Sequence, residues 1–338
     1  AAADADTACA APAELLTAFN ELGITQFAVP EALGGAATEQ SPMTNVLIAE
    51  ELGRGDMGLA VAALAPIGVA NALVRWGSAD QQAKYLPAFA ESDPPRAALA
   101  IGEPRPLFEA AAMASRATSK NGGYVLNGIK SMVPLGNHAD FFLVAAELDT
   151  KGPHVFLVRP DLPGVTVEPA PAMGIRAAGT CTLRFADTPL TAGDLLGERV
   201  GACAFTEMID LARLAWCGLA LGTAQAVLDL VIPYCNERIA FGEPITNRQS
   251  VAFMIANIAL ELDGMRMLTY RAASRAEQGL PFHREAYLAR LQCAEKGMEI
   301  GTNGVQLLGG HGFVKEYPVE RWYRDLRVIG VAEGGLMA

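Results

Sequence analysis

The last third of the chain carries polar and glycine residues suited to a ligand with a negatively charged diphosphate. Arg238 offers a forked guanidinium group that can make charge-assisted hydrogen bonds to a pyrophosphate. Gly309 and Gly310 remove side chains at a point where a ligand would pass close to the backbone. Gln249 and Gln306 add neutral hydrogen-bonding groups. We therefore take these five residues as candidates for binding a dinucleotide.

Arg238 and the two glycines also have a simpler structural interpretation. Arg238 can cap the C-terminal end of a helix, where the helix dipole favours a cation. Gly309 and Gly310 can form the stop signal of the preceding helix. Because a single short motif often occurs by chance, no single one of these residues establishes a ligand site.

The elements that must position these candidates fall into three regions: 1–95, 96–200 and 201–338. The first is predicted to be an N-terminal helical domain, because apolar residues recur there at helical spacing. Its helices are expected at residues 43–53, 57–76 and 79–90, the last capped by Ser78 or Asp80. Residues 1–12 are small, acidic and rich in alanine, and are expected to form a frayed lead-in, not a secretory signal.

The second region is predicted to be a middle β domain. Glycine and proline punctuation separates short runs with strand character, at residues 124–130, 141–146, 155–158, 164–168 and 182–185. Runs this close together leave no room for helical crossovers. The sheet is therefore expected to be mostly antiparallel and to form a small barrel or sandwich.

The third region is predicted to be a C-terminal four-helix bundle. Long helices are expected at residues 204–239, 250–277 and 283–308, with a bend of the first at Pro233. Helices that are apolar on more than one face need partners on several sides, which four-helix packing and an oligomer interface supply. The fold class is therefore α+β.

The composition disfavours several classes of function. The chain has 338 residues, of which 51% are hydrophobic, and a net charge of −11, which argues against nucleic acid as a partner. No run of about eighteen residues is purely apolar, so no membrane span is expected. The six cysteines show no CxxC spacing and the four histidines are scattered, which indicates reduced thiols in a cytoplasmic protein without a metal site.

Several motifs resemble, in order and spacing, those of the acyl-CoA dehydrogenase family. The C-terminal set comprises RIAFG at 238–242, Pro244, Ile245, Gln249, QLLGGHGF at 306–313, EYP at 316–318, Arg324, Asp325, Glu333 and Gly334. Weaker matches are LGITQFAVPEALGG ending at Gly35, Glu103–Pro104 and residues 124–130. The resemblance therefore extends over nearly the whole chain.

This resemblance implies an FAD-dependent enzyme, or a subunit of one, that introduces a double bond between the α and β carbons of an acyl-CoA thioester. It also implies a dimer or tetramer and an electron-transfer flavoprotein as electron acceptor. The residues it implies to reach an FAD held mainly by the neighbouring subunit are Arg238, Phe241, Gln249, Gln306, Gly309 and Gly310.

Two further site residues follow from the same resemblance. Glu333 matches the family's catalytic base, which would remove a proton from the carbon next to the thioester carbonyl if burial raises its pKa. The alternative is a solvated glutamate. Arg213 matches an arginine near the substrate, and its alternative is an ion pair with Asp210 or Glu207.

The first half departs from the family's own flavin-binding pattern. The resemblance would place threonine at Gly102, serine at Phe108 and Trp-Ile-Thr at 132–134, where this chain has Met-Val-Pro. A threonine expected two residues after the base is Gly335. The chain thus lacks residues that would contact its own flavin but keeps those that would reach a partner's flavin. In this it resembles the short subunit of α2β2 actinobacterial acyl-CoA dehydrogenases that act on steroid side chains.

Two alternatives to a complete enzyme follow from these departures. One is a non-catalytic subunit that completes the FAD site of a longer homologue in a heteromer. The other is a binding module without cofactor, although such a module has no need of Arg238 or Gln249. The acyl group itself is not encoded in any motif.

Overall fold

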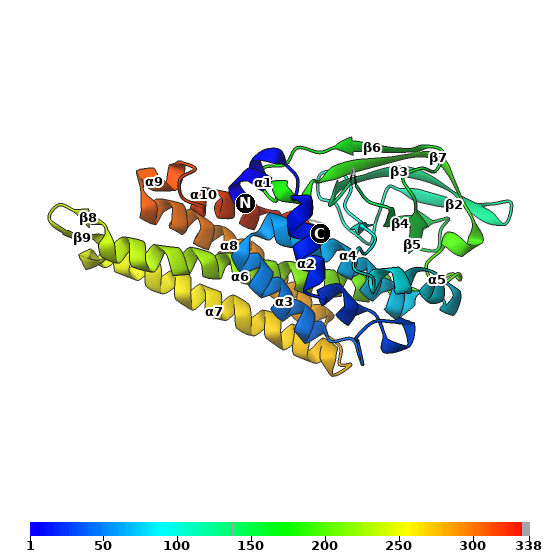
Figure 1. Cartoon of the computed structure of the whole chain (residues 1–338), viewed down its shortest axis with the longest axis horizontal. Coiled ribbons are helices and arrows are strands. Elements are labelled where there is room, and N and C mark those ends of the chain that lie inside the picture. Colours follow the sequence, from blue (N-terminus) through cyan, green and yellow to red (C-terminus); the bar gives the residue numbers. More distant parts are fainter. Residues whose placement is uncertain (137, 333–338) are drawn as a thin grey trace.

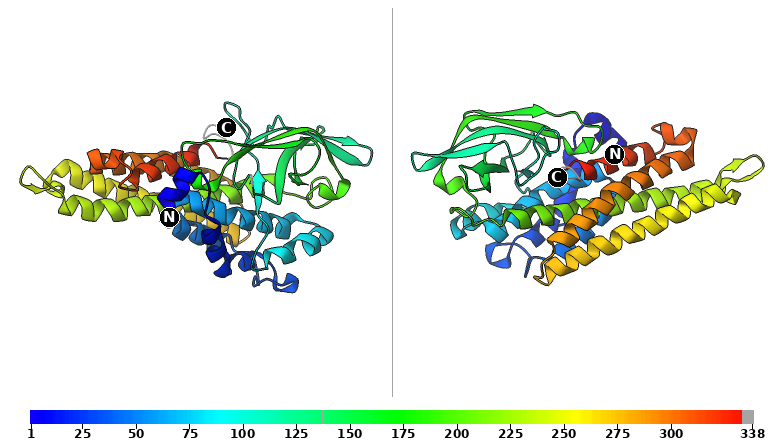
Figure 2. Two further views of the ribbon diagram at one scale, coloured as in Figure 1. Left: turned by 45° about the horizontal axis from the view of Figure 1, so that its top comes forward. Right: turned by 180° about the vertical axis from the view of Figure 1, so that it is seen from behind.

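The computed structural model describes residues 1–136 and 138–332. Long helices run along the molecule, and a β-sheet domain packs at one end of them (Figure 1). The sheet lies on one side of the helical layer in both further views (Figure 2). The molecule therefore combines helical and β domains, as the sequence predicts for an α+β fold.

The N-terminal helices lie close to their predicted positions. They are α1 (Ala2–Ala8), α2 (Ala13–Glu21), α3 (Pro42–Gly55), α4 (Met57–Trp76) and α5 (Ala79–Phe89). Local caps explain where three of them start, beginning with Ser41, which accepts from the amide of Thr44 at the start of α3. Asp56 accepts from the amide of Leu59 at the start of α4, and Ser78 forms a capping box with Gln81 at the start of α5. The predicted buried helix is α4, most of whose residues are buried.

The frayed lead-in expected at the N-terminus is wrong. Residues 2–8 form α1, and Asp6 is buried. Both carboxylate oxygens of Asp6 accept hydrogen bonds of 3.0 Å from the guanidinium of Arg324. The partner lies 318 residues away in the sequence, so a pattern of local residues did not reveal it.

The middle domain contains one seven-stranded sheet. Its strands are β1 (Ala97–Ala100), β2 (Arg116–Lys120), β3 (Gly123–Val133), β4 (Phe141–Leu148), β5 (Pro153–Val158), β6 (Val165–Pro169) and β7 (Cys181–Leu190). The five predicted strands are present as β3 to β7. The sequence did not reveal β1 or β2, because β1 is mostly alanine and β2 is largely polar and exposed, so neither has the composition typical of strands.

The pairing of the strands is mostly antiparallel, as predicted. The pairs β2–β3, β3–β7, β4–β5 and β6–β7 are antiparallel, whereas β1 and β2 both pair in parallel with β4. The sheet also curls. Tyr124 of β3 packs edge-on against Phe156 of β5 with ring centroids 5.3 Å apart, although these strands are not hydrogen-bonded neighbours. The inward faces of the strands thereby share one core.

The C-terminal region contains α6 (Phe205–Glu237), the short strands β8 (Ile239–Ala240) and β9 (Glu243–Pro244), α7 (Gln249–Glu277), α8 (His283–Leu308), α9 (Gly310–Phe313) and α10 (Val319–Leu326). The long helices α6, α7 and α8 pack on one another, with α10 against α8. Pro233 lies inside α6, which continues through it.

The bundle has a further long member from the N-terminal region, α3, which packs against α6 and α7. Their backbones approach closely at glycines. A Cβ atom on Gly222 of α6 would lie 1.8 Å from the carbonyl oxygen of Glu50 in α3. Only glycine fits there, so α3 and the C-terminal helices form one packed unit.

Two helices, α4 and α6, are long and apolar enough to cross a membrane by length and composition alone. In their most apolar windows, 72% of α4 and 61% of α6 is buried inside the protein. That degree of internal burial is typical of core helices.

Candidate functional site

A cavity of about 620 Å³ lies where the three domains meet. The middle domain contributes the loop around Gly102–Phe108 and the end of β3, and the helices α4 and α6 form the opposite wall. Val328, Gly330, Val331 and Ala332 close one side. Its lining is mostly apolar, with few polar groups. Cavities of this size and character bind small molecules.

A buried ion pair fixes the loop that forms one wall. Lys130 Nζ lies 3.0 Å from Oε1 of Glu103, and neither residue is exposed by more than 7%. The carboxylate of Glu103 also accepts from the amides of Ala114 and Ser115 at 2.7 and 2.9 Å. Burial lowers the pKa of Lys130 to about 8, despite the opposing carboxylate. For Glu103, burial raises the pKa, but Lys130 and the two amides outweigh it and lower the pKa below 4.5.

The segment that leads to Glu333 is anchored by charged residues of α10. Asp325 accepts a 2.6 Å hydrogen bond from the amide of Ile175, and burial raises its pKa to about 7. Arg324 donates to Asp6 and to the carbonyl of Met173. The Arg324–Asp325 motif therefore joins α10 to the middle domain. Glu333 and Gly335 lie outside the described residues, but Ala332, which directly precedes Glu333, lines the cavity.

The predicted cofactor-binding residues are brought together, but at the other end of the bundle. Arg238 is the C-cap of α6, and Gln249 begins α7. Gln306 and Gly309 lie at the end of α8. The two chain segments meet there, because the hydroxyl of Tyr234 in α6 lies 2.8 Å from Nδ1 of His311 in α9. Figure 1 shows this end, with β8, β9 and α9, furthest from the sheet.

The polar groups of this end are not used within the subunit. Among residues 1–136 and 138–332, the side chains of Arg238, Gln249 and Gln306 have no hydrogen-bond or ion-pair partner, and all three are exposed. Phe241 is 94% exposed, has a left-handed backbone with φ of 56°, and lies under the guanidinium of Arg248. Uncommitted donors beside an exposed aromatic ring fit an anionic, aromatic ligand.

The simpler structural interpretations are also confirmed. Arg238 does end α6, and Gly309 ends α8 with φ of 57° and ψ of −128°, a conformation that favours glycine. Neither role uses a side-chain donor. The structural and ligand-binding interpretations are therefore compatible.

Within one chain, the cavity and this exposed end lie far apart. Trp216 of α6 lines the cavity, and Arg238 follows it by 22 residues, which is about 33 Å at 1.5 Å per helical residue. The exposed end is therefore not part of the cavity of its own chain. The polar set fits the role that the sequence predicts, which is contact with a cofactor of a neighbouring subunit.

Arg213 forms an ion pair with Asp210, which is the alternative to substrate binding that the sequence left open. Its Nη1 atom lies 3.3 Å from Oδ1 of Asp210, whose other oxygen lies 2.7 Å from Nδ1 of His283. Burial raises the pKa of Asp210, although His283 and Arg213 oppose this. The Nε atom of Arg213 is buried without a hydrogen-bond partner among the described residues. Arg213 is not among the residues that line the cavity.

Residues of the first half that depart from the family's flavin-binding pattern lie around the cavity. Gly102, Phe108, Met132 and Pro134 line it, and the carbonyl of Gly102 accepts the amide of Ser131 at 2.9 Å. This wall therefore offers apolar contact but few side-chain donors to a polar ring edge. The sequence did not single out Leu64, Gly68 and Trp216 as lining residues. Their only signal was the run of small residues in α4 and α6.

Known proteins match this chain over its full extent. The family models described as the N-terminal, middle and C-terminal domains of acyl-CoA dehydrogenase match residues 1–93, 98–188 and 200–335. A short-chain specific acyl-CoA dehydrogenase of rat mitochondria is 34% identical over 334 residues, covering 96% of this chain and 79% of the relative. A short-chain specific acyl-CoA dehydrogenase of Megasphaera elsdenii is 32% identical, covering 95% and 86%.

A solved structure agrees. Butyryl-CoA dehydrogenase from Megasphaera elsdenii superposes with a TM-score of 0.90 at 29% identity, covering 99% of this chain and 90% of that one. The same three domains are therefore matched both by sequence and by structure. The chain belongs to the acyl-CoA dehydrogenase family, whose members are flavin-dependent oxidoreductases acting on the CH–CH group of acyl-CoA thioesters.

Proposed function

We propose that the chain is a subunit of an oligomeric acyl-CoA dehydrogenase that desaturates an acyl-CoA thioester with FAD, Glu333 being the base. The cavity carries this proposal. It is large enough for an acyl group, its walls are mostly apolar, and its lining includes Ala332, which directly precedes Glu333 in the sequence. An apolar surrounding raises the pKa of a carboxyl group toward neutrality, which suits a proton acceptor.

The residues of this chain have distinct parts in that reaction. The walls formed by α4 and α6 exclude water from the acyl group, and the Lys130–Glu103 pair holds the facing loop in place. The carboxylate of Glu333 takes the proton from the α carbon. FAD, when bound, accepts the hydride from the β carbon. We propose that Arg238, Phe241, Gln249, Gln306, Gly309 and Gly310 hold the FAD of a neighbouring subunit.

The oligomer is supported by an exposed apolar stripe on α7. Phe253, Leu260 and Met267 follow one another at intervals of seven residues on one face, with 59%, 70% and 69% of each residue exposed. Figure 2 shows α7, in yellow, along the outer edge of the molecule. We propose that this stripe contacts another subunit, and that an electron-transfer flavoprotein accepts the electrons. A cytoplasmic location is supported by six free cysteines.

Replacement of the base tests the proposal. Glu333→Gln keeps the size of the side chain but cannot accept the proton, so turnover of acyl-CoA should fall by a factor of about 10² to 10⁴ with unchanged flavin content and unfolding midpoint. Glu295→Gln, at an exposed position of α8, is the control and should keep full activity. Full activity of Glu333→Gln would contradict the assignment.

The apolar lining at Gly102, Phe108, Met132 and Pro134 supports a second candidate. In it, this chain is the non-catalytic subunit of a heteromer and completes the FAD site of a longer homologue. The two candidates differ in flavin content. Close to one FAD per chain in the protein purified alone supports a homomeric enzyme, whereas flavin retained only after co-expression with a homologue supports the heteromer.

A further inference from the structure

A second cavity, of about 520 Å³, lies directly beside the first. It is enclosed by α3, α4, α6 and the segment before α3. The two cavities share five lining residues: Leu64, Gly68, Leu99, Ala212 and Ala215. The two cavities therefore have a wall in common, the partition.

Three of the five residues that form the partition are small. Gly68 of α4 has no side chain, and Ala212 and Ala215 of α6 have only a methyl group. A Cβ atom built on Gly68 would meet only Leu99 Cδ1, at 3.8 Å, which is ordinary contact. The space at Gly68 is thus real room for a ligand, and a larger residue there would occupy it without moving the backbone.

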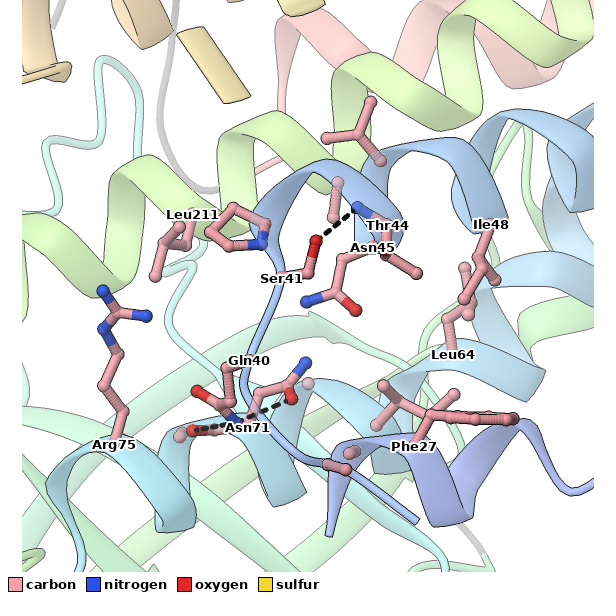
Figure 3. A pocket seen from close by; sticks show the side chains of 18 of the residues that line it. Phe27, Gln40, Ser41, Thr44, Asn45, Ile48, Leu64, Asn71, Arg75 and Leu211 are labelled. Carbon is pink, nitrogen blue, oxygen red and sulfur yellow. Dashed lines mark hydrogen bonds between the residues drawn. The ribbon is translucent and has the colours of Figure 1, made fainter. Parts of the chain in front are cut away.

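The far cavity differs from the first in carrying amide side chains. Gln40, Asn45 and Asn71 surround it, together with the apolar Ile48 and Phe27 (Figure 3). Gln40 donates from Nε2 to Oδ1 of Asn71 over 3.0 Å. In the described part of the chain, the side-chain amide of Asn45 has no hydrogen-bond partner. This amide is a half-buried donor and acceptor available to a ligand.

Three charged side chains line the far cavity: Arg75, Glu277 and the exposed Glu39. Arg75 is paired with Glu207, with distances of 3.0 Å from Nε and 2.8 Å from Nη2 to the carboxylate. Glu277 accepts from the hydroxyl of Ser41 and from the amide of Met43. The cavity therefore offers no unpaired cation to an anionic ligand, and Glu277 would repel one. A neutral hydrogen-bonding group fits this environment best.

We propose that the acyl group of the substrate crosses at Gly68 and ends in the far cavity, so that the substrate is a long acyl-CoA with a neutral polar group, such as a hydroxyl or keto group, near its far end. This inference rests on the proposed function, since it places the thioester near Glu333. From Ala65 to Arg75 the two cavities extend along ten residues of α4, about 15 Å. That length exceeds what a short acyl group requires.

Binding of three thioesters to the purified oligomer tests the inference by calorimetry: butyryl-CoA, dodecanoyl-CoA and 12-hydroxydodecanoyl-CoA. Each methylene that enters the passage contributes about fourfold to affinity, so dodecanoyl-CoA should bind more than about tenfold more tightly than butyryl-CoA. The hydroxyl should add about two- to tenfold. Gly68→Leu should raise the Kd of dodecanoyl-CoA about tenfold more than that of butyryl-CoA, whereas Gly55→Leu, in open space at the end of α3, should not.

Asn45→Leu tests the polar end by itself. It should abolish the preference for the hydroxylated thioester while leaving dodecanoyl-CoA bound at least as tightly. An unchanged ratio of dodecanoyl-CoA to butyryl-CoA affinity in Gly68→Leu would overturn the passage. No preference for the hydroxyl in the original protein would overturn the polar end. If Gly68→Leu blocks binding of dodecanoyl-CoA but the original protein turns over no thioester, the result supports the passage and contradicts the proposed function.

Discussion

Arg321 donates from Nε to Oδ2 of Asp56 over 2.8 Å, and the same carboxylate accepts the amide of Leu59 at the start of α4. Both side chains are nearly buried, at 11% and 4% exposure. Asp56 therefore caps the helix that lines both cavities and ties it to α10. Since α10 leads into the segment at Val328–Ala332, this pair fixes the two opposite walls of the site relative to each other.

Removal of this carboxylate is expected to be costly. Asp56→Ala leaves the guanidinium of Arg321 buried without its partner and removes the cap, so the free energy of unfolding should fall by about 3–5 kcal/mol. Asp229→Ala, which breaks the exposed pair with Arg54, should cost about 1 kcal/mol or less. Urea unfolding measures both. Equal losses would show that the buried pair has no special role.

Asp325 should make stability depend on pH. Its pKa is raised to about 7 in the folded protein from about 3.8. The folded state therefore holds a proton that the unfolded state has lost between about pH 4 and 7, and stability falls as pH rises through this window. Asp325→Asn cannot ionise and keeps an acceptor for Ile175, so it should be more stable than the original protein at pH 8, by at most about 4 kcal/mol.

The measurement for Asp325 is the urea midpoint at pH 5, 6, 7 and 8. The difference between the variant and the original protein should grow toward high pH. Parallel profiles of the two proteins would mean that another group carries the pH dependence.

Lys130→Met should disturb the cavity wall as well as the fold. It removes the buried cation that lies 3.0 Å from the carboxylate of Glu103 and leaves only the partly exposed Arg105, whose Nε lies 3.8 Å away. The free energy of unfolding should therefore fall by up to about 3–5 kcal/mol. Because Glu103 holds the loop at Gly102–Phe108, the affinity for acyl-CoA should also fall. The double variant Lys130→Met with Glu103→Leu removes both charges and should recover part of the stability. No recovery would argue against the ion pair as the cause.

Arg238→Gln should weaken retention of FAD in the assembled protein. A charge-assisted hydrogen bond contributes about 1.5–3 kcal/mol, which is about a 10- to 150-fold change in affinity. Arg284→Gln changes the same charge at an exposed position near the opposite end of α8 and is the control. Flavin absorbance after gel filtration measures the outcome. Equal flavin content in both variants would remove Arg238 from the cofactor site.

Leu260→Asp should dissociate the oligomer, because it places a charge in the middle of the apolar stripe on α7. Leu22→Asp alters a leucine that is 67% exposed outside the stripe and should leave the oligomer intact. Sedimentation velocity distinguishes the two results. An unchanged oligomer in Leu260→Asp would place the subunit contact elsewhere.

The sequence by itself determined the long helices and the order of the three regions. The residues that set these features are close together in the chain. The apolar periodicity of α7 and α8 and the capping box at Ser78 and Gln81 act within a few residues, so their positions follow from local rules. The motif at Arg238, Gln249 and Gly309 also identified which end of the bundle carries uncommitted polar groups.

Only the tertiary structure decided the features that depend on distant partners. The strands β1 and β2 form because β4 pairs with them, and α1 is held because Asp6 meets Arg324. The partnership of Arg213 with Asp210 was one of two local possibilities, and packing selected it. The two adjoining cavities lie between α4 and α6, and the space between helices depends on their packing, which no local pattern specifies.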